Sequence, residues 1–432
     1  MCTVRLILVL ACKDDHDLSS VDVRQAYLYA KVDEQLYMRM PPTLPRHDAK
    51  GNELVVKLNR SLYGLRQAAR QWNKLLVSFL KQWGFVQSTI DCCMFIYEGE
   101  GNSIIRLAIW VDDLVISASS PAIRTQFVKD LSTTFDVEDN GDLQWILGVQ
   151  VQRKRKTREL SLSQNQYIKD ILARHAPQVN MTRKVDTPLA PEETLSREQC
   201  PAEGSPEKQA MKTKHTEYMQ VVGALLWLAS FTRPDLTYAA SVLARFVSNP
   251  GGSHYTAMQR TLAYLYHSAT HGLLFKPDKC DLIVYSDADW STKYSTSGGI
   301  CYVHGCPVHW HTRLQRSVSH STAEAEYIAA SMAARETVFL RELLVDLHVS
   351  TKQTTEMKLD SKSAIDMAFD PVAFKKTKHI LRDAEYLRDL VARETFKPTH
   401  VASADQRADT FTKQLPRMPF LAIRDHLVSD VC

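Results

Sequence analysis

The chain has 432 residues, 44% of them hydrophobic, so it is long enough to bury roughly two or three cores rather than one. Its 53 basic and 49 acidic residues nearly balance, so the net charge permits phosphate binding through local basic grooves without indicating it. The nine cysteines have no repeating spacing, and no stretch is apolar enough to cross a bilayer, which argues against a disulfide-stapled secreted protein and a membrane-spanning one.

The first apolar run covers residues 6–11, between Arg5 and Cys12. This pattern also fits a short signal segment or lipoprotein box, and that alternative stays open. The run is too short to span a bilayer, and two acids, Asp14 and Asp15, follow almost at once. We therefore predict the end of a buried helix that leads into a first acidic site.

Up to about residue 170, short β-like runs alternate with helical ones. Branched and aromatic residues predict strands at 55–58, 93–97 and 107–116, and residues 61–83 are predicted to form a helix. The basic run at 153–158 is predicted to be a charged hairpin tip, with phosphate contact as the alternative. One buried helical stripe is indicated by four apolar residues at four-residue spacing: Ile123, Phe127, Leu131 and Phe135.

The middle of the chain changes character. Several prolines lie among Glu, Ser and Lys between residues 186 and 214, which predicts an exposed connection. Residues 218–271 are predicted to be mostly helical, with a break at Arg233 because proline disfavours helix at the residue before it. From Asp281 onward the pattern becomes strand, hairpin, helix, strand, helix, which indicates a separate α/β domain.

Three acids form the first candidate site. Asp112 and Asp113 lie between two apolar strands, at the tip of a predicted hairpin, and Asp22 lies at the end of another short strand. Neighbouring carboxylates repel each other, so a fold that keeps them together usually supplies cations. Three such acids could hold two Mg²⁺ ions, which demand oxygen ligands.

Four acids form the second candidate site. Each lies where a predicted strand or helix begins or ends: Asp287, Glu326, Asp360 and Asp409. Ser321 and Glu324 fit a capping box, which places Glu326 one turn inside a helix. Ser403 is predicted to cap a short helix around Asp409, with Gln406 as its partner.

Longer motifs carry a resemblance to one family. They are Asp22-Val-Arg-Gln-Ala-Tyr27, Tyr37-Met-Arg-Met-Pro-Pro42, Asn59-Arg-Ser-Leu-Tyr-Gly-Leu-Arg-Gln-Ala-Ala-Arg-Gln-Trp72, Trp145-Ile-Leu-Gly-Val149 and Thr232-Arg-Pro-Asp-Leu-Thr-Tyr238. In this order they resemble copia-type retrotransposon Pol polyproteins, in the reverse transcriptase and RNase H region. The resemblance spans nearly the whole chain.

The resemblance implies an α/β fold: an α+β palm-type polymerase part followed by an RNase H-like α/β domain. The expected domains are a palm and thumb part lacking fingers at 1–170, a connection at 171–280 with the exposed linker near 186–214, an RNase H-like domain at 281–416 and a tail at 417–432. Only 21 residues precede Asp22, where the family has a long fingers segment, so we expect polymerase activity to be impaired.

The resemblance also implies roles for single residues. Asp22, Asp112 and Asp113 match the polymerase metal ligands, and Asp287, Glu326, Asp360 and Asp409 match the four acids of RNase H. Tyr27 matches the aromatic under the incoming sugar, with a core tyrosine as the alternative. Tyr63 and Arg66 match the nucleotide-pocket segment, although both could be helix-surface residues. Asp289 and Glu324 are neighbouring acids that could replace the expected ligands.

The implied activity is RNA-directed DNA polymerisation together with two-metal hydrolysis of RNA in RNA–DNA hybrids. Mg²⁺ is the expected cofactor, with Mn²⁺ as a substitute, and the expected partners are an RNA–DNA hybrid, an RNA template, a DNA primer and dNTPs, without a membrane. The expected location is intracellular, in cytoplasmic virus-like particles and also the nucleus. Two alternatives stay open: an inactive remnant that at most binds nucleic acid, and a ribonuclease H only.

One further group of metal-binding residue types is interpreted as structural. It comprises Cys301, His304, Cys306, His309 and His311. Neighbouring residues on a strand point to opposite faces, and the spacing fits no common tetrahedral zinc template. The resemblance makes this segment two strands of the RNase H-like domain that turn near Gly305.

Overall fold

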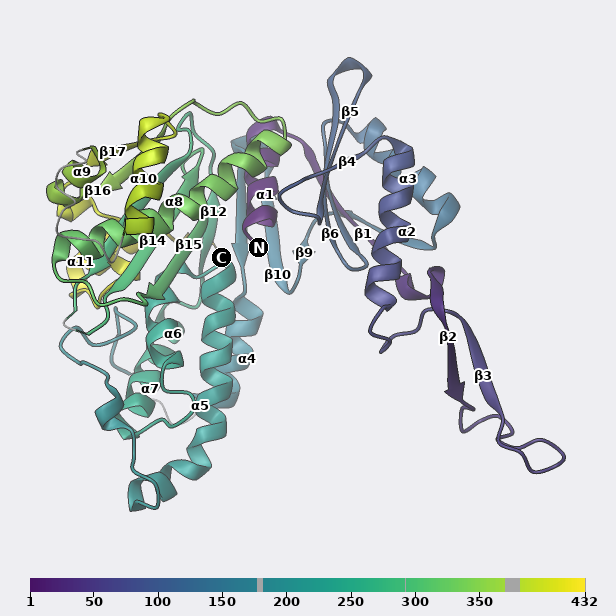
Figure 1. Cartoon of the computed structure of the whole chain (residues 1–432), viewed down its shortest axis with the longest axis horizontal. Coiled ribbons are helices and arrows are strands. Elements are labelled where there is room, and N and C mark those ends of the chain that lie inside the picture. The colour runs from purple at the N-terminus through teal and green to yellow at the C-terminus, as the bar shows by residue number, and fades with distance from the viewer. Residues whose placement is uncertain (177–181, 292, 370–380, 432) are drawn as a thin grey trace. The chain divides into compact units, whose positions relative to one another are not determined.

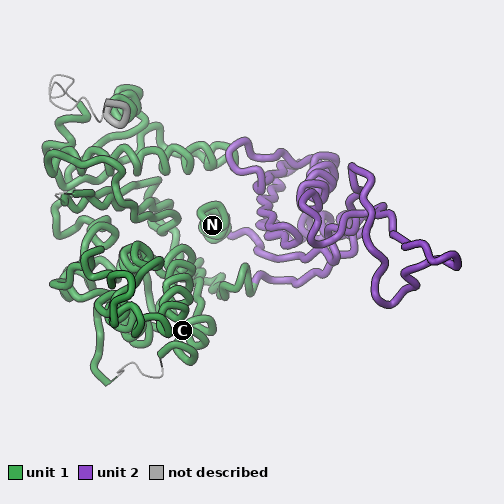
Figure 2. The backbone as a smooth tube through the Cα atoms, turned by 60° about the horizontal axis from the view of Figure 1, so that its bottom comes forward, with its two compact units in different colours: residues 1–13, 144–432 green, residues 14–143 purple. Residues whose placement is uncertain are grey.

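The computed structural model describes residues 1–176, 182–291, 293–369 and 381–431, in two compact units. Unit 1 comprises residues 1–13 and 144–432, and unit 2 comprises residues 14–143 (Figure 2). The predicted boundary near residue 170 differs from this division, because strand β11 (Glu159–Ser163) pairs with β12 (His271–Phe275) of the expected connection.

Unit 2 is built on one sheet with the strand order β4-β5-β6-β7-β1-β8. Neighbouring strands are antiparallel: β4 (Val86–Gln87), β5 (Met94–Gly99), β6 (Ser103–Trp110), β7 (Asp113–Ala118), β1 (Asp17–Val23) and β8 (Val137–Asp142). The predicted buried stripe is confirmed: Phe127 and Leu131 of helix α3 (Pro121–Thr134), followed by Phe135, are in the core. Ile123 packs against that core and is itself partly exposed.

Helix α2 (Ala68–Trp83) lies beside the same sheet (Figure 1). Its Trp72 is part of the core of unit 2. The helix begins seven residues later than predicted, because Gly64 adopts a left-handed φ of 100° and the chain turns twice before Ala68. Ahead of α2, the strands β2 (Lys31–Arg39) and β3 (Val55–Arg60) form a two-stranded ribbon of their own, so the predicted strand at 55–58 is confirmed.

Unit 1 contains a helical part and two sheets. Its helical part comprises α4 (Asn165–His175), α5 (Pro206–Phe231), α6 (Thr237–Ala244) and α7 (Gly252–His267). The last three follow the prediction for residues 218–271, but α5 begins earlier, at residue 206, inside the expected linker. The predicted break follows α5, where Arg233 and Asp235 form a fully buried ion pair of 2.7 Å. The first sheet has the order β18-β12-β11-β10-β9, with β9 (Trp145–Ile146), β10 (Val149–Lys154) and β18 (Ser429–Asp430) beside the two strands already given. Because β18 pairs with β12, the expected C-terminal tail is part of this sheet.

Helix α1 (Cys2–Asp14) is the buried helix predicted at the start of the chain. Its Arg5 side chain is 4% exposed, donates to the carbonyls of Val308 and Ser230 at 2.7 Å each, and lies 3.9 Å above the Trp310 ring. Backbone carbonyls and the face of an aromatic ring thus stabilise the buried positive charge of Arg5. At the other end, basic side chains of the 153–158 hairpin tip donate to the last carbonyls of α1.

The second sheet of unit 1 has the order β15-β14-β13-β16-β17. Strands β13 (Ile283–Asp289), β14 (Thr296–Val303) and β15 (Cys306–Leu314) are antiparallel, whereas β16 (Thr355–Leu359) and β17 (Phe396–His400) run parallel to β13. Helix α8 (Thr322–Asp346) lies against this sheet (Figure 1). Its Ala325 and Ala329 pack on Ala288 of β13. Shorter helices complete this part: α9 (Lys362–Phe369), α10 (Leu381–Ala392), η8 (Ser403–Asp405), η9 (Asp409–Phe411) and α11 (Arg417–Arg424). The predicted α/β class is confirmed.

The eight cysteines within the described residues form no disulfide with one another. Cys301 lies opposite His309 in the β14–β15 register, and its buried thiol contacts Thr337 Oγ1 at 3.4 Å. His304 and Gly305 form the turn between these strands, as predicted. No helix in the described part of the chain is both long and apolar enough to cross a membrane.

Candidate active site

Three of the four acids predicted for the second site converge at one edge of the β13 sheet. Asp287 lies near the end of β13, and Asp360 directly follows β16. Because these two strands are parallel, their carboxyl ends meet at the same edge. Glu326 reaches that edge from the first turns of α8. One carboxylate oxygen from each of the three residues lies within 4.8 Å of the others.

The predicted cap of α8 explains why Glu326 is held there. Ser321 is the N-cap residue, and its hydroxyl accepts from the Glu324 backbone N–H at 3.2 Å. The Glu324 carboxylate accepts from the backbone N–H of His320 at 2.9 Å. Glu324 therefore fixes the start of the helix, while Glu326, two residues later, points into the acidic cluster.

The fourth acid, Asp409, lies beside the other three without joining their close group. It begins the short helix η9, and the following residues fold back onto β13. Thr412 Oγ1 donates to Asp287 Oδ2, and Lys413 Nζ lies 3.1 Å from Asp409 Oδ1 and 3.8 Å from Asp287 Oδ2. Lys413 is thus a member of the site that sequence reasoning missed.

The short helix predicted around Asp409 is wrong. Two separate 3-10 turns, η8 and η9, take its place. Gln406, the expected cap partner, donates from Nε2 to the backbone carbonyl of Ser286 at 2.9 Å, and the Ser403 hydroxyl donates to Asp360 Oδ2 at 3.3 Å. Both side chains make tertiary contacts with the strands that carry the acids, which local capping rules do not reveal.

The acids strongly perturb one another. Burial, reinforced by the charges of Asp287 and Asp360, raises the pKa of Glu326 to about 10. Burial and the charge of Asp287 raise the pKa of Asp409 to about 7, although Lys413 opposes the shift, and burial and Asp287 also raise the pKa of Asp360. Glu326 Oε2 is buried without a hydrogen-bond partner among the described residues. Such a set of oxygen donors fits a divalent cation, which would offset the repulsion.

Asp289 lies two residues beyond Asp287 and is only partly buried. Burial raises its pKa, while Lys413 acts in the opposite direction. Its carboxylate does not belong to the close group of three acids. Asp289 thus lies outside the close group, as Asp409 does, whereas the Glu324 carboxylate is engaged in the helix cap.

The first predicted site lies in unit 2, and its geometry is looser. Asp22 of β1 faces Asp113 of β7 in the antiparallel register, and the Val23 N–H donates to the Asp112 carbonyl at 3.0 Å. Val111, just before the pair, has a left-handed φ of 61°, and its carbonyl accepts from the indole of Trp72 at 2.6 Å. This bond holds the strained turn on which the acids depend.

The three acids of unit 2 influence one another's protonation. Burial followed by the charge of Asp112 raises the pKa of both Asp22 and Asp113. In the described residues, however, the three carboxylates do not reach the 4.8 Å convergence found for Asp287, Glu326 and Asp360. The cluster around Asp287 is therefore the better-formed of the two.

The residues predicted for a nucleotide pocket lie beside the first site. The rings of Tyr27 and Tyr63 are 4.6 Å apart, and burial followed by the charge of Asp112 raises the pKa of Tyr63. Tyr27 also packs against the core of unit 2, as expected if it is a core tyrosine. Arg66 is exposed in the turn before α2, so it is not a helix-surface residue.

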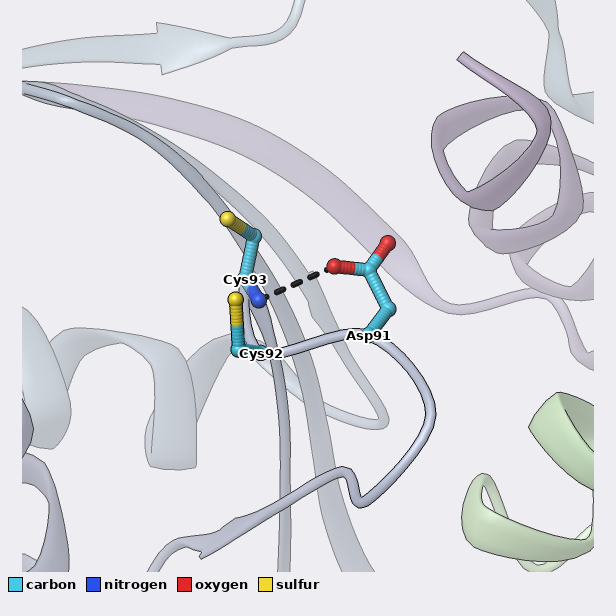
Figure 3. A group of neighbouring side chains, drawn as sticks. All are labelled: Asp91, Cys92 and Cys93. Carbon is cyan, nitrogen blue, oxygen red and sulfur yellow. Dashed lines mark hydrogen bonds between the residues drawn. The ribbon is translucent and has the colours of Figure 1, made fainter.

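A second group of possible metal ligands, Asp91, Cys92 and Cys93, lies in one turn of unit 2 (Figure 3). Asp91 Oδ1 accepts from the backbone N–H of Cys93 at 3.0 Å, as in a tight turn. Burial and the adjacent Cys92 raise the pKa of the Cys93 thiol to about 11. Metal binding at this turn would therefore require the Cys93 thiol to lose its proton first.

Comparison with known proteins shows what the chain is similar to. Residues 1–191 match the family described as reverse transcriptase (RNA-dependent DNA polymerase). The chain is 34% identical over 424 residues to the retrovirus-related Pol polyprotein from transposon TNT 1-94 of Nicotiana tabacum, covering 97% of this chain and 31% of that protein. It is also 34% identical over 425 residues to the corresponding polyprotein from transposon RE1 of Arabidopsis thaliana, covering 97% of this chain and 28% of that protein.

The chain thus spans less than a third of the length of these curated relatives. Among solved structures, a foamy viral protease-reverse transcriptase in complex with double-stranded DNA has a similar fold, with a TM-score of 0.50 at 11% identity. That similarity covers 89% of this chain and 57% of the viral one.

Proposed function

We propose that this chain hydrolyses the RNA strand of RNA–DNA hybrids, because it belongs to the family of copia-type retrotransposon Pol polyproteins. The proposed site is the cluster of Asp287, Glu326, Asp360 and Asp409. The observation that carries the proposal is the convergence of three carboxylates within 4.8 Å at one sheet edge. Burial raises the pKa of Glu326 to about 10, which supports the proposal. A bound cation would stabilise the ionised carboxylates of such a buried group.

Asp287 would be the central ligand, with Glu326 and Asp360 on one side and Asp409 on the other. Thr412 orients the Asp287 carboxylate by its hydrogen bond, and Gln406 ties the strand that carries it to the segment of Asp409. Divalent ions held there would activate an attacking water molecule and stabilise the leaving 3′-oxygen. We propose Mg²⁺ as the resident ion and Mn²⁺ as a functional substitute.

The proposed substrate is the A-form-like hybrid, recognised through its backbone and 2′-hydroxyl groups rather than its sequence. Incubating the chain with Mg²⁺ and four end-labelled substrates tests this: an RNA–DNA hybrid, single-stranded RNA, duplex RNA and duplex DNA. We expect cleavage of the RNA strand in the hybrid only, and none after chelation of the metal. Equal cleavage of single-stranded RNA, or no cleavage of the hybrid in Mg²⁺ or Mn²⁺, would refute the proposal.

We further propose that Asp22, Asp112 and Asp113 form an RNA-directed DNA polymerase site that uses dNTPs. The match of residues 1–191 to the reverse transcriptase family and the pairing of Asp22 with Asp113 favour it. Since these carboxylates converge less closely, we expect primer extension on an RNA template to be slower than hybrid cleavage.

Asp113→Asn should abolish that primer extension and leave hybrid cleavage unchanged, because the two acidic sites share no residue. Extension from a labelled DNA primer and cleavage of a labelled hybrid are measured on the same preparation. Asp136→Asn, at an exposed acid of the same unit, serves as the control. Extension that persists in Asp113→Asn would show that these acids do not form the polymerase site.

A further inference from the structure

The side chain of Lys413 lies among the four acids of the ribonuclease-type site. Its Nζ is 3.1 Å from Asp409 Oδ1 and 3.8 Å from Asp287 Oδ2. Within the part of the chain that the structure describes, no other lysine, arginine or histidine is in ion-pair contact with any of these acids. One half of the cluster therefore already contains a positive charge.

The local chain holds this ammonium group in place. The backbone N–H of Lys413 donates to the Asp409 carbonyl at 3.2 Å, and the preceding Thr412 donates from its hydroxyl to both Asp287 Oδ2 and the Asp409 carbonyl. The Lys413 side chain is 37% exposed, so its tip can still reach solvent. A lysine stem is flexible, and its charge can withdraw without unfolding the segment.

The acids divide into two halves that share Asp287. Asp287, Glu326 and Asp360 come within 4.8 Å of one another, and no described cation is paired with Glu326 or Asp360. Asp287 and Asp409 have the Lys413 ammonium between them. A divalent ion bound to this second pair would lie a few ångströms from the ammonium, where repulsion between like charges is strong.

We propose that the Lys413 ammonium group takes the place of a second divalent ion at the Asp287–Asp409 half of the site. The free protein then binds one divalent ion tightly, at Asp287, Glu326 and Asp360, and a second only when the ammonium withdraws. The negative phosphodiester of a bound hybrid offsets the added charge and favours that second ion. This inference rests on the proposed ribonuclease function. It adds the number of divalent ions that the site binds in the absence of nucleic acid.

Counting bound Mn²⁺ tests the inference without any measurement of activity. The full chain, free of nucleic acid, is titrated with Mn²⁺ and followed by electron paramagnetic resonance and calorimetry. We expect one tight ion for the wild type and for Lys413→Arg. Lys413→Met and Lys413→Gln should bind two, with the second site tightened at least about tenfold, or about 1.4 kcal/mol. Lys358→Met, which removes a lysine paired with Glu356 at 2.6 Å, is the matched control and should bind one.

Two tight ions in the wild type, or an unchanged count in both neutral Lys413 variants, would overturn the role of Lys413 while leaving the proposed ribonuclease function standing. Absence of any Mn²⁺ binding in the folded wild type would overturn both. Thermal melting of each variant verifies folding, and the wild-type count decides the question even if one variant fails to fold.

Discussion

Replacing Asp360 by Asn is expected to lower the rate of RNA cleavage in an RNA–DNA hybrid by more than about 100-fold. Even the loss of a partner outside the direct ligand shell of a metal typically costs 10–100-fold. Asn keeps the size of the side chain but removes the negative charge that Asp360 shares with Asp287 and Glu326. Single-turnover cleavage of a labelled hybrid in saturating Mg²⁺ measures the effect.

The matched control is Asp366→Asn, at an exposed acid of the neighbouring helix α9. It removes the same charge from the same part of unit 1 without touching the cluster, so its rate should equal that of the wild type. If Asp360→Asn cleaved as fast as Asp366→Asn, the activity would have to come from residues outside the cluster.

The metal-free protein is expected to lose stability as the pH rises, and Glu326→Gln should remove much of that loss. In the folded protein the pKa of Glu326 is raised from 4.5 to about 10. The folded state therefore holds a proton that the unfolded state releases above about pH 4.5, so stability is full below that value and falls until the pH passes about 10. Asp409, with a pKa raised to about 7, adds a smaller loss that ends near neutral pH.

Calorimetric melting in chelator at pH 6 and pH 9 tests this pH dependence. The wild type should melt lower at pH 9, by roughly 2–4 °C for each kcal/mol lost, and Glu326→Gln should show a smaller difference. Mg²⁺ should stabilise the wild type more at pH 9, because the ligands must lose their protons to bind it. Glu342→Gln, at an exposed position of α8, should behave as the wild type. An equal pH dependence in wild type and Glu326→Gln would contradict the assigned burial of Glu326.

The parts of the fold that were predictable from sequence depend on local patterns. The apolar strands around Asp112 and Asp113 predicted the β6–β7 hairpin, and the Ser321–Glu324 spacing predicted the start of α8. In both cases neighbouring residues in the sequence determine the geometry. The grouping of Asp287 with Asp360 came from the family resemblance instead, and the structure supplies its reason, because both acids come at the ends of strands that run parallel in the sheet.

The features that were missed depend on contacts between distant segments. Lys413 and Gln406 act on Asp287 and Ser286 of β13, more than a hundred residues earlier in the chain. The unit boundary differs from the predicted one because β11 pairs with β12 across the whole helical part. Neither propensity nor spacing indicates such pairings, because a buried polar contact is specified by packing rather than by local sequence.

The chemistry of the RNA ends left by cleavage tests the central claim most directly. If the acidic cluster directs water against the phosphodiester and the 3′-oxygen leaves, the products carry a 5′-phosphate and a 3′-hydroxyl. Cleavage in ¹⁸O-labelled water should place the label in the new 5′-phosphate, as read by mass spectrometry. Products ending in a 2′,3′-cyclic phosphate would mean that the RNA's own 2′-hydroxyl attacks, and would contradict metal-dependent hydrolysis at this site.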